Sequence, residues 1–251
     1  MHDWNDRDNE DIMAEMEQQQ PAKQNFDIFV NLCEGYLEWE VPSIDVIYTL
    51  ELLNLPFTGP TTKLYDPPKE LMKYLAYCEG VKTPGYVLIN ELANVDDAVN
   101  HLTFPLFVKP AKAGDSLGVD DRSLVHNKIE EYVAGREFTV LVAANADEHS
   151  CTVFRPVEYL FPQGRTFKTY ALKTSELHPD CNVPCTDEAL DRQLRAATER
   201  IFKGFNGVGY ARLDFRVNEK NEIYFLEINF TCSVFYKDGY EGSADFIIKF
   251  D

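Results

Sequence analysis

The chain has 251 residues, of which 45% are hydrophobic and 26% are charged, and its formal net charge at pH 7 is −18. No apolar run approaches the roughly 20 residues that a membrane helix needs, and the N-terminus lacks a secretory signal pattern, so we expect neither a membrane protein nor a secreted one. The negative charge disfavours nucleic-acid partners, because phosphate backbones are also negative. We expect a cytoplasmic protein in which the six scattered cysteines are free thiols.

The first third of the chain predicts an acidic tail and then a fragment of an α/β layer. Residues 1–25 are polar and rich in acidic side chains, so we expect a disordered tail. An apolar run of strand length begins at Phe26, and a helix is expected from Ser43 to a cluster of prolines and glycine. A second helix should follow Pro67 and end at Gly80. Its apolar residues at helical spacing are Leu71, Tyr74, Leu75 and Cys78.

Short strands dominate the rest of the chain, which predicts antiparallel sheets. The expected strands are residues 86–89, 106–109, 138–142, 152–159 and 169–173. A long helix is expected over about residues 186–203, with Gly204 as its stop. The side chains that it should turn inward are Leu190, Leu194, Ala197 and Ile201. The whole pattern predicts an α+β fold on antiparallel sheets that follows an α/β fragment.

The last expected hairpin, residues 207–217 and 222–230 around a short polar turn, carries the most informative pattern. With a period of two, one face holds Ala211, Leu213, Phe215 and Val217, continued by Tyr224, Leu226 and Ile228. The opposite face holds Arg212, Asp214 and Arg216, then Ile223, Phe225, Glu227 and Asn229. Asp214, Glu227 and Asn229 should therefore lie close to one another.

These two acids and the asparagine form a candidate metal site. Two carboxylates and an amide oxygen are hard ligands that suit Mg²⁺ or Mn²⁺ shared with phosphate oxygens. A solvated face of a half-exposed sheet would show the same alternation. Acidic groups among so many aromatic and aliphatic residues cost more than on an open surface, which favours the metal site over that alternative.

Three further segments carry nucleotide-binding candidates, although each one alone also fits an ordinary structural element. An apolar strand ends at Lys109 and leads into a small loop whose candidates are Gly114, Ser116 and Gly118. Backbone N–H groups of such a loop can approach phosphates, but a plain hairpin turn would look the same. Glu130 and Glu137 flank a run that also fits a charged linker. Lys173 ends an expected strand, where a lysine normally faces solvent.

Taken in chain order, these segments resemble the ATP-grasp superfamily, specifically the D-alanine–D-alanine ligase family, over about residues 26–245. The strand that ends at Lys109 is similar to the family's strand with an ATP-phosphate lysine, and Lys69 stands where the family has its other nucleotide lysine. The run from Glu130 to Glu137 resembles the hinge that contacts adenine and ribose, and Lys173 matches a lysine at the phosphates. The resemblance implies a catalytic Arg212 and, as metal ligands, Asp214, Glu227 and Asn229.

The resemblance also implies a fold and its boundaries. The expected architecture is an ATP-grasp fold of the α+β class, in which two α+β subdomains clamp ATP, preceded by a partial α/β pre-ATP-grasp domain. The partial domain would cover residues 26–66 and the ATP-grasp domain residues 67–251. Within the latter, the small central subdomain would end at about residue 132 and the catalytic subdomain would begin at about residue 133.

The implied activity is an ATP-dependent, ADP-forming ligation of a small-molecule carboxylate to an amine. Amino acids are the expected substrates, and ATP and Mg²⁺ (or Mn²⁺) the expected cofactors. ATP would phosphorylate the carboxylate while Mg²⁺ neutralises the phosphates, and an amine would attack the acyl phosphate. Arg212 would stabilise the developing oxyanion, and the loop of residues 114–118, with Ser116, would close as a lid. Family members commonly form dimers through the N-terminal domain, so the expectations include a homodimer.

The departures from the family pattern lie at positions that would line the substrate pocket. Asp115 stands where the family has a serine, although Ser116 follows, and Thr174 replaces a frequent tyrosine. An acidic tail replaces the family's N-terminal strand and glycine-rich turn, so we expect an N-terminally truncated or divergent member. Three alternatives stay open: an ATP-grasp ligase with a non-amino-acid acceptor, a catalytically silent nucleotide-binding protein, and a metal-free interaction module.

Overall fold

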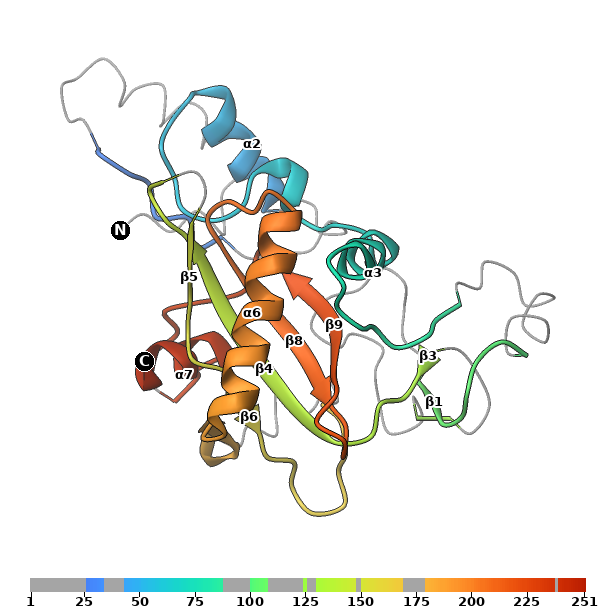
Figure 1. The fold of residues 1–251 in the computed structure, drawn as a ribbon. Helices are drawn as coiled ribbons and strands as arrows, with labels where there is room; N and C mark the ends of the chain where they lie inside the picture. The colour runs from blue at the N-terminus through green and yellow to red at the C-terminus, as the bar shows by residue number, and fades with distance from the viewer. Residues whose placement is uncertain are drawn as a thin grey trace.

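The computed structural model describes residues 26–33, 43–87, 100–107, 124–125, 130–147, 150–168, 179–237 and 239–251 (Figure 1). The expected acidic tail and the expected strand 169–173 lie outside these residues. Both sheets are antiparallel throughout the described part, which confirms the expected α+β class. None of the helices in these ranges is both long enough and apolar enough to cross a bilayer.

A short helical segment closed by an isolated parallel β-bridge precedes the main sheet. Its helix α2 (Ile44–Leu52) follows a segment in which Phe29 forms a parallel bridge with Phe57. The bridge is completed by two backbone hydrogen bonds, from the Phe29 N–H to the Pro56 carbonyl and from the Thr58 N–H to the Phe29 carbonyl. The strand expected from Phe26 is thus a single bridge, and a short 3₁₀ helix, η1 (Thr62–Leu64), leads away from the segment.

The main sheet has six strands and is organised around its longest one, β4 (Arg136–Ala144). The other strands are β5 (Cys151–Val153), β6 (Val157–Tyr159), β7 (Asn182–Pro184), β8 (Tyr210–Val217) and β9 (Ile223–Asn229). Their order is β7-β6-β4-β8-β9, and β5 pairs with the far end of β4. The single strand expected over residues 152–159 is divided into β5 and β6, because Pro156 has no N–H to continue the ladder.

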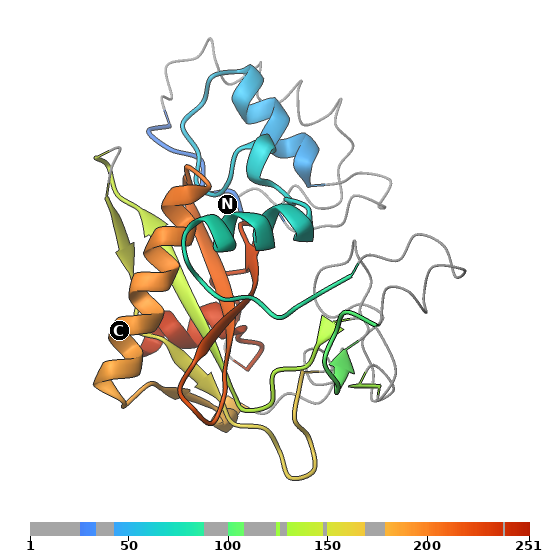
Figure 2. The same cartoon turned by 45° about the vertical axis from the view of Figure 1, so that its right-hand side comes forward.

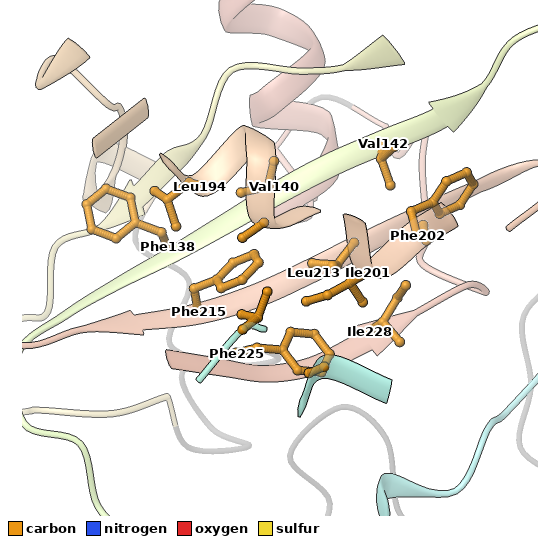
Figure 3. Packing of buried hydrophobic residues seen from close by; sticks show 14 of the residues in the cluster. Phe138, Val140, Val142, Leu194, Ile201, Phe202, Leu213, Phe215, Phe225 and Ile228 are labelled. Carbon is orange, nitrogen blue, oxygen red and sulfur yellow. The ribbon is translucent and has the colours of Figure 1, made fainter. Parts of the chain in front are cut away.

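Helix α6 (Glu188–Gly204) covers one face of this sheet (Figures 1 and 2). The Asp187 carboxylate caps its N-terminus by accepting hydrogen bonds from the Ala189 and Leu190 N–H groups. Its inward side chains include the four expected ones, together with Thr198 and Phe202, and the apolar ones pack on the alternate apolar residues of β4, β8 and β9 (Figure 3). This interface is the main hydrophobic core.

Gly204 does not stop α6, as the sequence had suggested, but lies inside its last turn. A Cβ at this position would lie 2.9 Å from a methyl carbon of Leu75, so the glycine allows a close approach to the neighbouring helix. The chain leaves the helix at Asn206, which has a left-handed φ of 51°.

Helix α3 (Lys69–Cys78) packs against β9 and α6. The predicted apolar stripe is wrong for most of its members, because Leu71 and Tyr74 are exposed and Met72 and Ala76 are buried in the core instead. Met72 and Ala76 are spaced by one turn, and the partly buried Leu75 packs beside them, so a narrow stripe of three residues seats this short helix. The helix ends before Gly80, as expected, with Gly80 at a φ of 68°.

The opposite face of the main sheet is only partly covered by a helix. Helix α7 (Ser243–Phe250) packs there through Ala244 and Ile247 against Leu141 and Val157. The smaller sheet, in the order β2-β1-β3, consists of β1 (Leu106–Phe107), β2 (Leu124–Val125) and β3 (Glu130–Glu131). A second 3₁₀ helix, η3 (Pro179–Cys181), precedes β7. On the main sheet, the part of the face opposite α6 that α7 leaves uncovered carries the candidate site.

The two outer strands of the main sheet have few groups open to further pairing. On β9, the Phe225 N–H donates to the Lys82 carbonyl at 2.8 Å, and the Lys82 ammonium binds Glu222 at 2.6 Å. On β7, the last residue is Pro184, which has no N–H.

Candidate active site

Strands β8 and β9 place the predicted metal ligands on one face of the sheet. Asp214 lies directly opposite Glu227, and Arg212 lies opposite Asn229. The pairing of the two acids is one of the two registers that the length of the turn allowed. Side chains at paired positions of antiparallel strands are about 5 Å apart at Cβ, so the two carboxylates share one small region.

A β-bulge corrects the predicted faces of the first half of β9. The register shifts after Asp214, so that Phe225 lies opposite Phe215 and Leu226 is an extra residue in its strand. Phe225 is completely buried in the core beside Phe215, whereas a strict period of two had placed it with Glu227 (Figure 3). The bulge reverses the parity, and this reversal lets both halves of β9 turn apolar residues toward α6.

Asp214 is held by two side chains on its own face. Thr139 lies opposite it on β4 and donates its hydroxyl hydrogen to Asp214 Oδ1 at 2.7 Å. The guanidinium of Arg212 contributes Nε at 3.4 Å from Oδ1 and Nη2 at 3.4 Å from Oδ2. These partners fix the plane of the carboxylate in a largely buried environment, where a hydrogen bond is stronger than in water.

Lys69 extends this group from a different element. It is the first residue of α3, and its Nζ lies 3.8 Å from Glu227 Oε2. The Lys69 and Glu227 side chains are 18% and 28% exposed, so both are accessible to a small molecule while remaining close to each other. The structure thus brings together five sequence-predicted residues from α3, β8 and β9: Lys69, Arg212, Asp214, Glu227 and Asn229.

The donor set fits a divalent cation with a preference for oxygen. In the ranges that the structure describes, no three His, Cys, Asp or Glu side chains gather as a metal cluster, and the further oxygen donor beside the two carboxylates is the amide of Asn229, opposite Arg212. Asn229 Oδ1 accepts hydrogen bonds from the Thr231 N–H at 2.8 Å and the Thr231 hydroxyl at 3.0 Å. These contacts orient the amide oxygen, and the hydroxyl bond is the one that a cation can replace. Two carboxylates and an amide oxygen match the ligand preference of Mg²⁺ or Mn²⁺.

A second charged group, which we call the Glu137 cluster, lies on the same face and consists of Glu137, Lys168 and Arg216. Glu137 pairs with Arg216 across β4 and β8, two residues along each strand from Thr139 and Asp214. Glu137 Oε1 lies 3.3 Å from Lys168 Nζ, and Oε2 lies 3.3 Å from Arg216 Nε. At roughly 3.4 Å per strand residue, the Cα atoms of Glu137 and Arg216 lie about 7 Å along the strands from those of Thr139 and Asp214.

Aromatic rings surround the Glu137 cluster. The Arg216 guanidinium lies 5.2 Å from the ring centres of both Tyr132 and Phe161, and Lys168 Nζ lies 4.5 Å from that of Tyr159. Burial raises the pKa of Tyr159 to about 12, with Cys181 and Glu137 acting in the same direction. The Tyr159 hydroxyl is buried and has no hydrogen-bond partner among the described residues.

The other predicted site residues cannot be placed in this geometry. Glu130 pairs with Phe107 in the small sheet, but only its backbone is described. The remaining candidates lie outside the described residues: Lys109, Gly114, Ser116, Gly118 and Lys173.

Sequence reasoning missed roles for three residues that contact the predicted ones. Thr139 follows Glu137 by two residues, so the period of two that was applied to the hairpin would have found it on the same face. Arg216 was placed on the correct face but received no role. Lys168 carried no signal, because its contact with Glu137 joins segments that are 31 residues apart.

Comparison with known proteins connects this geometry to one family. The family model described as "D-ala D-ala ligase C-terminus" matches residues 80–234. Among curated relatives, the D-alanine–D-alanine ligase of Polaromonas naphthalenivorans is 29% identical over 204 residues, covering 72% of this chain and 61% of the relative. The ligase of the same name from Legionella pneumophila is 28% identical over 210 residues, covering 72% of this chain and 57% of its own. The chain thus spans about three fifths of these relatives.

Solved structures share the fold. A D-Ala:D-Ser ligase from Enterococcus faecalis superposes with a TM-score of 0.64 at 21% identity, covering 90% of this chain and 68% of its own. The D-alanyl-alanine synthetase A of Vibrio cholerae gives a TM-score of 0.66 at 18% identity, covering 90% and 72%. These superpositions confirm the ATP-grasp fold. Because the family model covers well over half of the sequence, the chain belongs to the D-alanine–D-alanine ligase family.

Proposed function

We propose that the chain is an ATP-dependent, ADP-forming carboxylate–amine ligase that acts through an acyl-phosphate intermediate. The observation that carries this proposal is the shared face of Arg212, Asp214, Glu227 and Asn229, with Lys69 at 3.8 Å from Glu227. Oxygen ligands for a divalent cation beside two cationic side chains are what transfer of a phosphoryl group requires. Membership of the family supplies the reaction class.

Each described residue has a definite task in this proposal. Asp214, Glu227 and Asn229 would hold Mg²⁺, which when bound neutralises phosphate charge. Lys69 lies on the Glu227 side and would bind a phosphate oxygen of ATP as a point charge. Arg212 keeps Asp214 oriented and directs its guanidinium along the same face, where it would stabilise the oxyanion that forms as the amine attacks.

The remaining nucleotide contacts are proposals from the sequence. Lys109 and Lys173 would bind phosphates, and Glu130 and Glu137 would contact the nucleoside. The loop that contains Gly114, Ser116 and Gly118 would cover the phosphates, with Ser116 near the reacting groups. The domain boundaries proposed for this activity are residues 26–66, about 67–132 and about 133–251.

The substrates that we propose are amino acids, with D-alanine as the first candidate. The curated relatives are named D-alanine–D-alanine ligases, and one structural neighbour is named a D-Ala:D-Ser ligase. Asp115 and Thr174 depart from the family pattern at positions that would line the substrate pocket, so the identity of the two substrates is less constrained than the reaction class. We also propose a homodimer, which light scattering of the purified chain would test.

The experiment that tests the function measures ADP release from Mg-ATP by the purified chain in the presence of pooled D- and L-amino acids. We expect amino-acid-dependent release that is abolished in Glu227→Gln. The matched control is Glu222→Gln, which alters a partly exposed glutamate in the turn of the same hairpin, bonded to Lys82, and should retain activity. Division of the amino-acid pool would then identify the substrates.

Two results would contradict the proposal in different ways. Mg-ATP binding without turnover would favour a catalytically silent nucleotide-binding protein, whereas turnover only with acceptors other than amino acids would favour a different ATP-grasp ligase. Absence of any Mg-dependent ATP binding would leave the polar face as an interaction surface.

A further inference from the structure

Arg216 is a buried cation on the site face whose guanidinium is bonded on all sides. It is 3% exposed, and each of its three nitrogens has an acceptor. Nε faces Glu137 Oε2 at 3.3 Å, and Nη1 donates to the Gly135 carbonyl at 2.9 Å. Nη2 donates to the Thr166 carbonyl at 2.5 Å and lies 3.4 Å from the Tyr132 hydroxyl. One side chain therefore joins three segments: the connection from β3 to β4, strand β4 itself, and the loop that follows β6.

The planar shape of the guanidinium is essential to this arrangement. Its carbon lies 5.2 Å from the ring centres of both Tyr132 and Phe161, and its nitrogens point to acceptors in different directions. A lysine ammonium is a single point with no plane, so it could not reach Glu137, Gly135 and Thr166 together. The contacts of Arg216 depend on its identity as well as on its charge.

The orientation of Glu137 follows from these contacts. Arg216 binds one carboxylate oxygen and Lys168 the other, so the plane of the carboxylate is fixed from two sides. Glu137 is 8% exposed, and burial of a carboxylate to that depth is costly unless such partners replace its lost solvation. Under the proposed function, Glu137 belongs to the segment that contacts the nucleoside.

A neighbouring arginine provides an internal comparison. Arg136 precedes Glu137 in β4, lies on the opposite face above the Phe138 ring, and binds both oxygens of Glu158 on β6. It links two strands at the same end of the sheet as Arg216 does, but it contacts neither Glu137 nor the segment from Tyr132 to Gly135. Loss of Arg136 should therefore weaken the sheet without moving the site.

We propose that Arg216 is a positioning residue that holds the Glu137 carboxylate and the Tyr132–Gly135 segment in the geometry that binds the sugar of the nucleotide. This inference rests on the proposed function and deepens it, because it names the residue that determines recognition at the nucleoside end. Arg216 acts through Glu137 and makes no contact with the reacting groups.

The test compares the affinities for Mg-ATP and Mg-2′-deoxy-ATP by calorimetry in four proteins: wild type, Arg216→Met, Arg216→Lys and the control Arg136→Met. We expect wild type to prefer ATP. Both Arg216 variants should lose about tenfold in ATP affinity, the size of one charge-assisted hydrogen bond, and bind the two nucleotides almost equally. At saturating ATP, kcat should change little while KM rises. Arg136→Met should melt at a lower temperature with an unchanged ratio of the two affinities.

The double variant Glu137→Gln/Arg216→Met completes the test. If Arg216 acts through Glu137, the double variant should bind ATP no more weakly than Glu137→Gln alone. Folded Arg216 variants that keep the wild-type preference for ATP would overturn the inference, as would failure of both to fold, which would show that Arg216 serves the fold alone. A wild type that binds Mg-ATP without any preference over the deoxy nucleotide would also overturn it. A wild type that binds neither would instead overturn the proposed function, and the inference with it.

Discussion

The two faces of the main sheet differ in what they demand of a side chain. Residues 138, 140 and 142 of β4 are apolar and completely buried beneath α6, where many shapes of similar volume satisfy the packing. Glu137 and Thr139 alternate with them along the strand and point to the other face, where each one has a specific polar partner. Because side chains alternate between the two faces of a strand, one set of residues in β4 stabilises the fold and the other set contributes to the site.

This contrast shows why the site can be rigid without being in the core. Packing of the apolar face against α6 holds the backbone of β4, β8 and β9 in place. The Cα positions of the polar face are therefore fixed as well, and only local contacts are needed to orient its side chains. Substitutions on the apolar face should therefore change the free energy of unfolding, and substitutions on the polar face should change ligand binding. The following predictions are tests of that separation.

The largest effect on stability is expected for Phe215→Ala on the apolar face. Phe215 is completely buried and packs edge-to-face on Phe225, so its loss should reduce the free energy of unfolding by about 3–5 kcal/mol. Urea denaturation followed by circular dichroism would measure it. A loss below about 1 kcal/mol would mean that the apolar face is not the main source of stability.

On the polar face, Asp214→Asn should mainly affect catalysis. It removes the charge from one of two carboxylates that would bind the cation, so turnover should fall by about 100-fold or more at moderate Mg²⁺ concentration. The loss of the charged contact with Arg212 should lower the free energy of unfolding by only about 1–2 kcal/mol. A variant that unfolds as readily as Phe215→Ala would contradict the separation of the two faces.

A smaller effect is expected for Thr139→Val, which removes the hydroxyl that binds Asp214 Oδ1. Valine has nearly the same shape, so packing against β6 and β8 should be retained while the carboxylate loses one of its two fixed partners. Mg²⁺ affinity in the presence of ATP should fall by about tenfold, and Thr139→Ser should restore it. Equal Mg²⁺ affinity in all three proteins would show that the Thr139 hydroxyl is not needed to orient Asp214.

The smallest effect concerns Tyr159, whose buried hydroxyl lacks a hydrogen-bond partner among the described residues. Tyr159→Phe should increase the free energy of unfolding at pH 7 by about 1 kcal/mol. The pKa of this hydroxyl is raised to about 12 from 10.0, so the unfolded chain loses its proton first and wild-type stability should decline between pH 10 and pH 12. In the variant that contribution to the decline should be missing. If the free energy of unfolding declined equally with pH in both proteins, the decline would not come from the Tyr159 hydroxyl.

Much of the fold and of the metal site was predictable because both depend on short-range patterns. The spacing in α6 identified four of its six buried residues, and alternation in the hairpin brought Asp214, Glu227 and Asn229 together. Phe225 was assigned to the wrong face, because a single extra residue reverses the parity and nothing local marks Leu226 as that residue. In α3 the predicted face was wrong, because the longer apolar series that contains Leu71 and Tyr74 was chosen over the face of Met72 and Ala76, which is the one that packs.

The Glu137 cluster could not be predicted from such patterns. Glu137 is 79 residues from Arg216 and 31 from Lys168, and only the pairing of β4 with β8 and the return of the loop after β6 bring them together. Sequence resemblance assigned Glu137 to the nucleotide, but it gave no indication of the cations that bind its carboxylate. Contacts of this kind become visible only when strand order is known.

The covered outer strands of the main sheet have a consequence for how copies of the chain meet. An exposed edge strand invites another chain to extend the sheet, which is a common route to aggregation. Here the Phe225 N–H is already bonded to the Lys82 carbonyl on one side, and Pro184 offers no donor on the other. Extension of this sheet by a neighbouring molecule is therefore disfavoured at these two positions, one on β9 and one on β7.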